Sequence, residues 1–290
     1  MSSPSFVRVA LAALLGLALL SGCATPEPLP PLTAPASGQR HPGKFVWFDL
    51  LTEDPETARH FYSELFGWTF EPFDEDGEYH LLRNDGVAIG GVARVERDDP
   101  EVPESLWLPT LSVENVDAAT VLVMQTGGEV VRRPENFPGR GRLVAVRDPV
   151  GAGLLLLRSE GGDPPDGERP IGGWLWTDLW TTDGEEASSF YAALVGYEAK
   201  DIATDQDHVY RVLGRDGRAR AGMVVLRTAQ VQDSWLPYVR VADLEETLAL
   251  AEANGGRLVL RSGDTAVIEG PTGAAVGVQQ HRHLAGGSGP

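Results

Sequence analysis

Hydrophobic and polar positions along this chain follow a strand-like pattern and then a helix-like one. Residues 45–52 are mostly apolar, aromatic or β-branched, which is typical of a buried strand. In the next segment apolar residues recur at three- and four-residue steps and share one face of a predicted helix: Ala58, Phe61, Tyr62 and Leu65. Asp54 and Pro55 suit the N-cap and first turn of that helix, and Gly67 suits its left-handed end.

Three short strands are predicted after this helix, at 68–73, 79–84 and 87–95. Asp85-Gly86 is a hairpin signal between the last two of them. The same order of one strand, one helix and three strands recurs at 107–113, 116–125, 129–133, 142–147 and 153–158. Further helices at 184–194 and 244–253 repeat the unit in the second half. The hydrophobic pattern therefore predicts four βαβββ modules.

The two halves of the chain also repeat each other in sequence. Trp47 and Asp49 in the first half correspond to Trp176 and Asp178 in the second, at an offset of 129 residues. A period of this length indicates duplicated domains rather than a solenoid. A weaker repeat lies inside each half, where for example Trp47 corresponds to Leu108. It divides each half into two modules that are too small to bury a good core alone. We therefore expect two modules to pair within each domain.

Composition divides the chain into six segments. They are a signal peptide at 1–22, a Pro-rich tether at 23–43, a first domain at 44–159, a linker at 160–171, a second domain at 172–281 and a disordered tail at 282–290. The tether is predicted to be extended and poorly packed. The linker is rich in Gly and Pro, so we expect two compact units with few contacts across it, and an extensive interface between the domains stays open as the alternative.

The N-terminus has the features of a signal that directs export. Arg8 precedes an apolar run at 9–20 that is too short to span a bilayer as a mature helix. The run ends in Leu-Ser-Gly-Cys, which resembles the lipobox of bacterial lipoproteins and implies that Cys23 is lipidated. Ala24 after it favours the outer membrane, with the protein facing the periplasm. The alternative is an ordinary secretory signal that contains a cysteine.

Charge and cysteine content exclude several classes of function. The formal net charge of −18 argues against nucleic acid as a partner, because phosphates require a basic surface. It also argues against electrostatic docking on anionic lipid, which leaves acyl chains on Cys23 as the link to the bilayer. Because Cys23 is the only cysteine, the chain has no disulfide framework and no CxxC site.

The paired modules resemble the vicinal oxygen chelate superfamily, which contains glyoxalase I, bleomycin-resistance proteins and extradiol dioxygenases. The resemblance rests on Trp-x-Asp-Leu-x-Thr-x-Asp from Trp47, on the Phe-Tyr pair and Leu-Phe-Gly-Trp that follow, and on the Asp-Pro-x-Gly-Ala turn at 148–152. It implies an α+β fold with four βαβββ modules paired into two domains. Each domain would be a half-open, eight-stranded cup around a small-molecule site.

The resemblance also implies where a metal would be bound. Metal-using members carry His, Gln or Glu on the first strand of each module and Glu on the last strand of each domain. Here these positions hold Trp47, Leu108, Trp176, Leu236, Leu155 and Gly277. None of these side chains ligates a divalent cation, so we expect two cups with no metal and no cofactor.

Aromatic and acidic residues remain as candidates for ligand binding. Strand alternation places Trp47 and Asp49 in the first cup. The same count places four residues in the second cup: Trp174, Trp176, Asp178 and Trp180. A tryptophan there could stack on a flat ligand, or could fill the space of the lost metal.

The two aspartates need partners in an apolar cup. Arg240 shares a predicted face with Leu236 and Tyr238, so it is expected to pair with Asp178. Ser112 replaces this arginine in the first domain, which leaves Asp49 to meet a ligand's amine or hydroxyl, or backbone groups. The ligand-binding candidates are therefore Trp47, Asp49, Trp176, Asp178 and Arg240. Asn136 and Arg140, in a segment that only the first domain has, are candidates for the rim of the first cup.

The sequence thus predicts a lipoprotein of the bacterial cell envelope that binds an unidentified small organic molecule in a Trp-lined cup. Two alternatives stay open. One is a glyoxalase-like lyase or isomerase that uses Asp49 as a general base in place of a metal. The other is a structural lipoprotein whose cups are filled by its own side chains.

Overall fold

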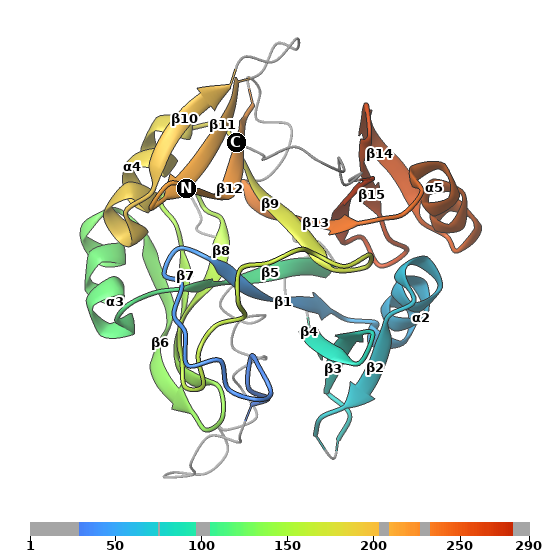
Figure 1. Cartoon of the computed structure of the whole chain (residues 1–290), viewed down its shortest axis with the longest axis horizontal. Helices are drawn as coiled ribbons and strands as arrows, with labels where there is room; N and C mark the ends of the chain where they lie inside the picture. The colour runs from blue at the N-terminus through green and yellow to red at the C-terminus, as the bar shows by residue number, and fades with distance from the viewer. Residues whose placement is uncertain (1–28, 75, 97–104, 203–208, 227–232, 281–290) are drawn as a thin grey trace.

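The computed structural model describes residues 29–74, 76–96, 105–202, 209–226 and 233–280. The predicted signal peptide, Cys23 and the C-terminal tail lie outside these ranges. Within them, no helix is both long and apolar enough to cross a membrane. The described chain forms two eight-stranded sheets with two helices each (Figure 1).

The first sheet has the strand order β2-β3-β4-β1-β5-β8-β7-β6. Its strands are β1 (Phe45–Thr52), β2 (Thr69–Pro72), β3 (Tyr79–Asn84), β4 (Val87–Arg94), β5 (Ser105–Ser112), β6 (Glu129–Phe137), β7 (Gly141–Arg147) and β8 (Gly153–Ser159). Its helices are α2 (Pro55–Phe66) and α3 (Val116–Gln125). Strand β1 pairs antiparallel with β5, which joins the two modules into one sheet.

The second sheet repeats this order as β10-β11-β12-β9-β13-β16-β15-β14. Its strands are β9 (Trp174–Thr181), β10 (Glu198–Ile202), β11 (Val209–Arg215), β12 (Arg218–Val225), β13 (Ser234–Arg240), β14 (Arg257–Ser262), β15 (Thr265–Glu269) and β16 (Ala275–Gln279). Its helices are α4 (Gly184–Val195) and α5 (Leu244–Ala253). The α+β class and the four paired βαβββ modules are confirmed.

Local signals act as the sequence indicates. The Asp54 side chain accepts a hydrogen bond from the backbone N–H of Thr57 at 3.0 Å, and Pro55 opens helix α2. Gly67 ends that helix with a φ of 70°, in the left-handed region. Asp85 and Gly86 both have positive φ in the β3–β4 hairpin, as a tight turn between twisted strands requires.

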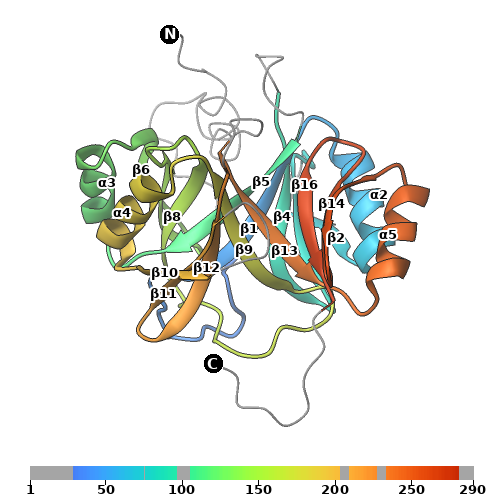
Figure 2. The same ribbon diagram turned by 90° about the horizontal axis from the view of Figure 1, so that it is seen from above.

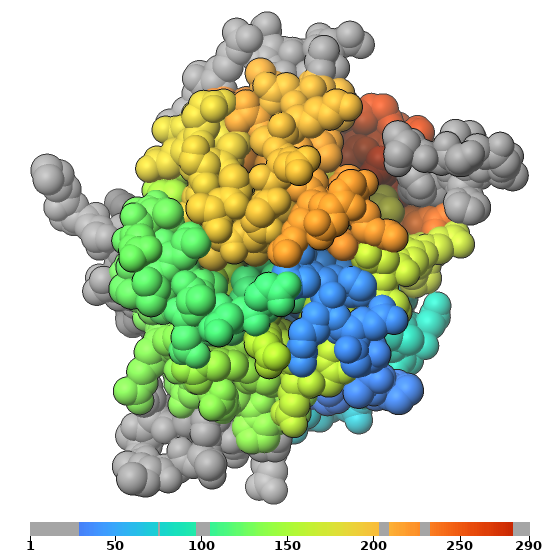
Figure 3. Space-filling model, turned by 60° about the vertical axis from the view of Figure 1, so that its left-hand side comes forward, coloured from blue at the N-terminus to red at the C-terminus, as the bar shows by residue number. Residues whose placement is uncertain are grey.

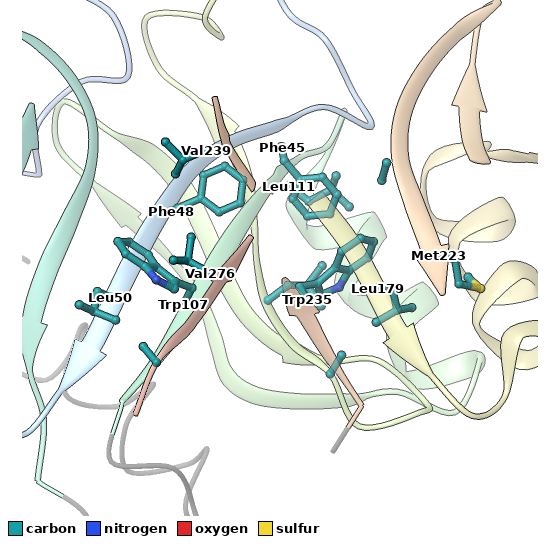
Figure 4. Packing of buried hydrophobic residues seen from close by; sticks show 14 of the residues in the cluster. Phe45, Phe48, Leu50, Trp107, Leu111, Leu179, Met223, Trp235, Val239 and Val276 are labelled. Atoms are coloured by element: carbon teal, nitrogen blue, oxygen red, sulfur yellow. The ribbon is translucent and has the colours of Figure 1, made fainter. Parts of the chain in front are cut away.

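The two sheets share one hydrophobic core. Their helix-side faces pack against each other, with Phe48 against Trp174 and Phe45 against Trp235, both at 4.6 Å between ring centroids (Figure 4). Helix α2 packs against α5 and helix α3 against α4, at opposite ends of the molecule (Figure 2). The prediction of few contacts between the domains is therefore wrong. One helix per module leaves apolar sheet surface bare, and the other domain covers it.

The prediction of a poorly packed tether is also wrong for its described part. Leu32 is 6% exposed and packs with the side chains of the first cup. Asp163 of the linker is fully buried, accepts hydrogen bonds from the backbone N–H of His41 and the hydroxyls of Ser112 and Ser159, and so ties both segments to the first sheet. A buried carboxylate with three donors holds these Pro- and Gly-rich segments in place where no helix or strand does.

Candidate functional site

Each sheet has a concave face that points away from the shared core, and we call these faces the first and second cup. In the first cup a cluster of 14 buried residues includes Trp47, Tyr79, Leu108 and Leu155. In the second cup the cluster among the described residues has three buried members, Leu236, Tyr238 and Val267, with Trp176, Trp180 and Ala275 partly buried against them. The second cup is therefore the more accessible of the two.

The same three-residue network lies at the centre of both cups. In the first, Asp49 Oδ1 accepts hydrogen bonds from Trp47 Nε1 at 2.9 Å and from the Tyr79 hydroxyl at 2.8 Å. The second network, Trp176, Asp178 and Tyr210, has the matching bonds at 2.8 and 2.9 Å. The four predicted residues Trp47, Asp49, Trp176 and Asp178 thus meet in pairs, as strand alternation indicates.

The two tyrosines were missed in the sequence. Tyr79 and Tyr210 occupy matched positions near the start of β3 and β11, and that repeat was the available signal. Each tyrosine reaches its aspartate over a glycine of the neighbouring strand. A Cβ atom at Gly91 would overlap the Tyr79 hydroxyl, and one at Gly222 would overlap the Tyr210 hydroxyl. These glycines are therefore required by close packing rather than by backbone conformation.

A β-bulge changes the face of one predicted residue. The pairing of β13 with β9 shifts register between Tyr238 and Val239, opposite the start of β9. Trp174 consequently packs on the helix side of the sheet, against Phe48, and donates from Nε1 to the Ile89 carbonyl at 2.9 Å. Its predicted place in the second cup is wrong, whereas Trp176 and Trp180 do lie there.

The predicted pair of Arg240 and Asp178 is not formed. Arg240 instead donates to the Arg169 carbonyl and to Glu168, at 3.2 Å for the carboxylate, so its guanidinium contacts the linker. Asp178 accepts hydrogen bonds from the Trp176 indole and the Tyr210 hydroxyl, and the Tyr238 hydroxyl also acts on it. Arg240 therefore holds the linker and does not contact the second cup's acid.

The first cup contains a buried cation that has no counterpart among the described residues of the second. The guanidinium of Arg140 lies 4.0 Å from the centroid of the Trp47 ring, and the residue is 4% exposed. Its positive charge acts on both Asp49 and Tyr79, and its Nε has no hydrogen-bond partner within the described chain. Asn136, the other rim candidate, is exposed and accepts from Arg142 at 3.2 Å. It lines a separate surface groove of about 970 Å³ and does not cover the cup.

The first cup is almost completely filled. A cavity of about 20 Å³ remains between Asp49, Tyr79, Thr110 and Arg140, closed by Leu143, Leu155 and Leu29 of the N-terminal segment. Such a space holds about one water molecule with several polar partners. A small organic ligand would have to displace Leu29 or Arg140 to reach Asp49.

Burial changes the protonation of both acids. It raises the pKa of Asp178 to about 6, against which hydrogen bonds from Tyr210 and Trp176 act only in part. Burial also raises the pKa of Asp49, and there the positive charge of Arg140 is the largest opposing effect. Within the described part of the chain, no cation acts on the acid of the second cup, and this acid changes its charge at a pH of about 6.

The residues at the family's metal positions do not fit a metal. Leu155 pairs with Thr110 on the neighbouring strand, whereas Gly277 pairs with Tyr238 and leaves room for the tyrosine ring, which a Cβ at 277 would overlap. Across the described ranges, no group of three or more His, Cys, Asp or Glu side chains is placed to hold a metal ion. The space of a first-strand ligand in each cup is taken by an indole.

Comparison with known proteins identifies relatives along most of the chain. A family model described as "Glyoxalase/Bleomycin resistance protein/Dioxygenase superfamily" matches residues 44–156. "Putative glyoxylase CFP32" of Mycobacterium tuberculosis is 29% identical over 255 residues, which cover 84% of this chain and 97% of that protein. "Anthracycline biosynthesis protein DnrV" of Streptomyces peucetius is 28% identical over 242 residues, covering 77% of this chain and 86% of that one.

Solved structures share the architecture at low sequence identity. The 2,2',3-trihydroxybiphenyl 1,2-dioxygenase of Sphingomonas wittichii superposes with a TM-score of 0.57 and 14% identity, covering 82% of this chain and 90% of that one. The Mn(II)-bound glyoxalase of Novosphingobium aromaticivorans gives a TM-score of 0.56 and 15% identity, with 82% of each chain covered. These similarities concern the fold and carry no conclusion on activity.

Proposed function

Because the chain belongs to the glyoxalase, bleomycin resistance protein and dioxygenase superfamily, we propose that it binds a small organic molecule in its second cup. One observation carries the proposal. Asp178, a buried acid with a raised pKa and no cation acting on it among the described residues, lies among Trp176, Trp180 and Tyr238, and the two indoles are only partly buried. An apolar wall with one oriented polar group is the usual composition of a small-molecule site.

The first cup is the poorer candidate. Its acid faces Arg140, and Leu29 closes what is left of its volume. This filling supports the structural alternative for the first domain, in which side chains replace both metal and ligand. The same enclosure disfavours Asp49 as a general base, because a base must come within hydrogen-bond reach of the proton that it removes.

The chemistry of the second cup favours a flat aromatic ligand with a hydroxyl or amino group. Indole and phenol rings at Trp176, Trp180 and Tyr238 offer faces and edges for stacking. Asp178 is largely ionised above pH 6 and would accept a hydrogen bond from the ligand's donor. Binding would need no metal, because the family's ligand positions hold Trp176, Leu236 and Gly277.

A titration of tryptophan fluorescence tests this function. The panel contains phenols, aromatic amines, matched hydrocarbons and an anthracycline, the last because a relative is named for anthracycline biosynthesis. We expect phenols or amines to quench fluorescence, EDTA to leave the quenching unchanged, and Trp176→Leu to weaken binding by about 1–3 kcal/mol, the scale of one large buried side chain. Trp47→Leu is the matched control from the closed cup and should leave affinity unchanged. Equal losses in both variants, or no binder in the panel, would reject the proposal.

A catalytic role is the second candidate, and it rests on the same acid. A carboxylate with a pKa near 6 can act as a general base at neutral pH. The M. tuberculosis relative is named as a glyoxylase. Each compound that binds is therefore also followed for turnover by mass spectrometry, with Asp178→Asn as the variant that should abolish turnover.

We further propose that the protein is a lipoprotein of the bacterial cell envelope, anchored through acyl chains on Cys23. The support is the sequence Leu-Ser-Gly-Cys after a short apolar run. The anchor would keep the second cup close to a membrane without any transmembrane helix.

A further inference from the structure

The N-terminal segment is docked along the first domain from residue 29 onward, and we call residues 29–41 the docked segment. The backbone N–H of Leu29 donates to the Pro138 carbonyl at 3.0 Å, in the turn between β6 and β7. Further along, Gly38 donates to the Gly161 carbonyl at 2.9 Å and His41 to the Asp163 carboxylate at 2.7 Å. This part of the chain, in blue, lies flat on the surface between neighbouring segments (Figure 3).

Docking shortens the chain that is free to act as a tether. If residues 23–43 were all free, they would span up to about 70 Å, whereas only six residue steps separate Cys23 from Leu29, at most about 22 Å. A compact protein of about 250 residues has a radius of gyration near 18 Å and therefore a diameter of about 45 Å. The chain from Cys23 to Leu29 can therefore reach at most about half the width of the molecule.

We propose that the rim of the first cup, at the β6–β7 turn, faces the bilayer and that the second cup opens away from it. The inference rests on the lipid anchor proposed for Cys23. A tether shorter than the diameter, attached at Leu29 beside this turn, does not allow the opposite face to reach the lipid surface. The partner of this face is therefore the bilayer surface itself.

In this orientation the two cups face different surroundings. The clusters that line the cups lie on opposite sides of the shared core, so the cups point in opposite directions. The end of β6 lies in the lower part of Figure 1 and β14 in the upper part. The proposed ligand site would consequently open to the aqueous compartment, while the filled cup faces lipid and needs no access.

Energy transfer in proteoliposomes tests the orientation with the lipidated full-length chain. Cys23 is the only cysteine, so a second one provides a single free thiol for a donor dye once Cys23 is acylated. Asn136→Cys labels the exposed end of β6, and Ser262→Cys labels the exposed end of β14. With an acceptor on lipid headgroups, we expect at least about twofold more transfer from position 136, given a tether of about half the diameter. Equal transfer, or more from position 262, would overturn the inference.

Two changes to the tether make the test specific. Leu32→Asp should release the docked segment back to Ser37, lengthen the free chain to about 50 Å and reduce the difference between the two labels. Pro31→Asp adds the same charge at an exposed neighbour and should keep the difference. Twelve Gly-Ser residues inserted after Ala24 should act like Leu32→Asp without touching the docked segment. An unchanged difference with the insertion would contradict control by tether length.

Mass spectrometry separates failure of the orientation from failure of the anchor. Acyl chains on Cys23 together with unequal transfer support both proposals. Acylated protein with equal transfer removes the orientation alone and leaves the lipoprotein proposal intact. Absence of acyl chains removes the anchor, and the orientation with it.

Discussion

The two cups have the same arrangement of central residues but differ at single positions. Both have a Trp-Asp-Tyr network with bonds of 2.8–2.9 Å, yet only the first has Arg140 above its indole. The cation offsets part of the cost of burying Asp49, whereas Asp178 relies on neutral donors alone. We therefore expect the two acids to contribute differently to stability as pH changes.

The pH dependence of stability should report on Asp178. Its folded pKa of about 6 lies above its unfolded value of 3.8, so its contribution is fully present below about pH 4 and is lost as pH rises through 6. The difference corresponds to about 3 kcal/mol. About a third of this contribution is already lost at pH 4.5, so denaturant unfolding at pH 4.5, 6 and 8 should show that Asp178→Asn flattens the decline by about 2 kcal/mol.

In the Asp178→Asn variant, Asp148 should still make the free energy of unfolding depend on pH. Its pKa is raised by burial to about 7, and its decline has the same sign at slightly higher pH. Asp85→Asn, at an exposed turn, is the control and should leave the whole profile unchanged. A profile for Asp178→Asn that matches the wild type would show that this acid is not buried in a protonated form.

Paired strands determine which side chains can fill a cup. In the first domain β5 and β8 place Thr110 beside Leu155, whereas in the second β13 and β16 place Tyr238 beside Gly277. Each strand pair combines a small with a large residue, and the large side chain comes from the last strand in the first domain but from β13 in the second. This exchange gives the second cup Tyr238 in addition to Tyr210.

Gly277→Ala should therefore destabilise the second domain. A Cβ at this position overlaps the Tyr238 ring, and overpacking of this kind costs about 1–3 kcal/mol. Gly167→Ala, in a linker position with open space around it, should cost much less. Chemical denaturation measures both, and equal effects would mean that Tyr238 moves aside freely.

At the scale of the whole molecule, the two domains form one folding unit. Tyr191 of the second domain donates to Asp148 of the first at 2.7 Å, and Trp68 of the first donates to the Gly172 carbonyl at 2.7 Å. A shared core of this kind couples the unfolding of both halves. The buried Asp163 protects the linker from local opening.

Limited proteolysis should consequently leave the linker intact under native conditions. We expect the first cleavage to fall outside both the linker and the docked segment, because opening the linker requires the loss of the three hydrogen bonds to Asp163. Calorimetry should show a single cooperative transition. Asp163→Ala should expose the linker to cleavage. Early cutting at 160–171 in the wild type would contradict the coupled core.

The membrane anchor is tested by Cys23→Ser. We expect this variant to appear in the soluble fraction or as an unprocessed precursor, since two or more acyl chains are needed for stable membrane attachment. Ser21→Ala, which leaves the cysteine in place, is the control. Normal processing and membrane retention of Cys23→Ser would reject the lipoprotein proposal.

Local sequence alone determined the modules and much of the cups. Caps such as Asp54 and Gly67 act within one turn, and strand alternation from Trp47 to Leu51 needs only neighbouring residues. The prediction that the family's positions hold no metal also rests on residue type, because tryptophan and leucine have no donor for it. These conclusions depend on interactions between residues close in the sequence and on residue type, both of which can be read from the sequence.

Only the tertiary structure decided how the parts close on each other. The sequence pattern left open the burial of Arg140 over Trp47, the docking of Leu29 and Leu32 in the first cup, and the shared core. The bulge that moved Trp174 is likewise set by pairing between strands far apart in the chain. Each of these is a long-range contact whose energy depends on the shape of the partner surface. The same short motifs therefore occur in both domains, yet one cup is filled and the other is accessible.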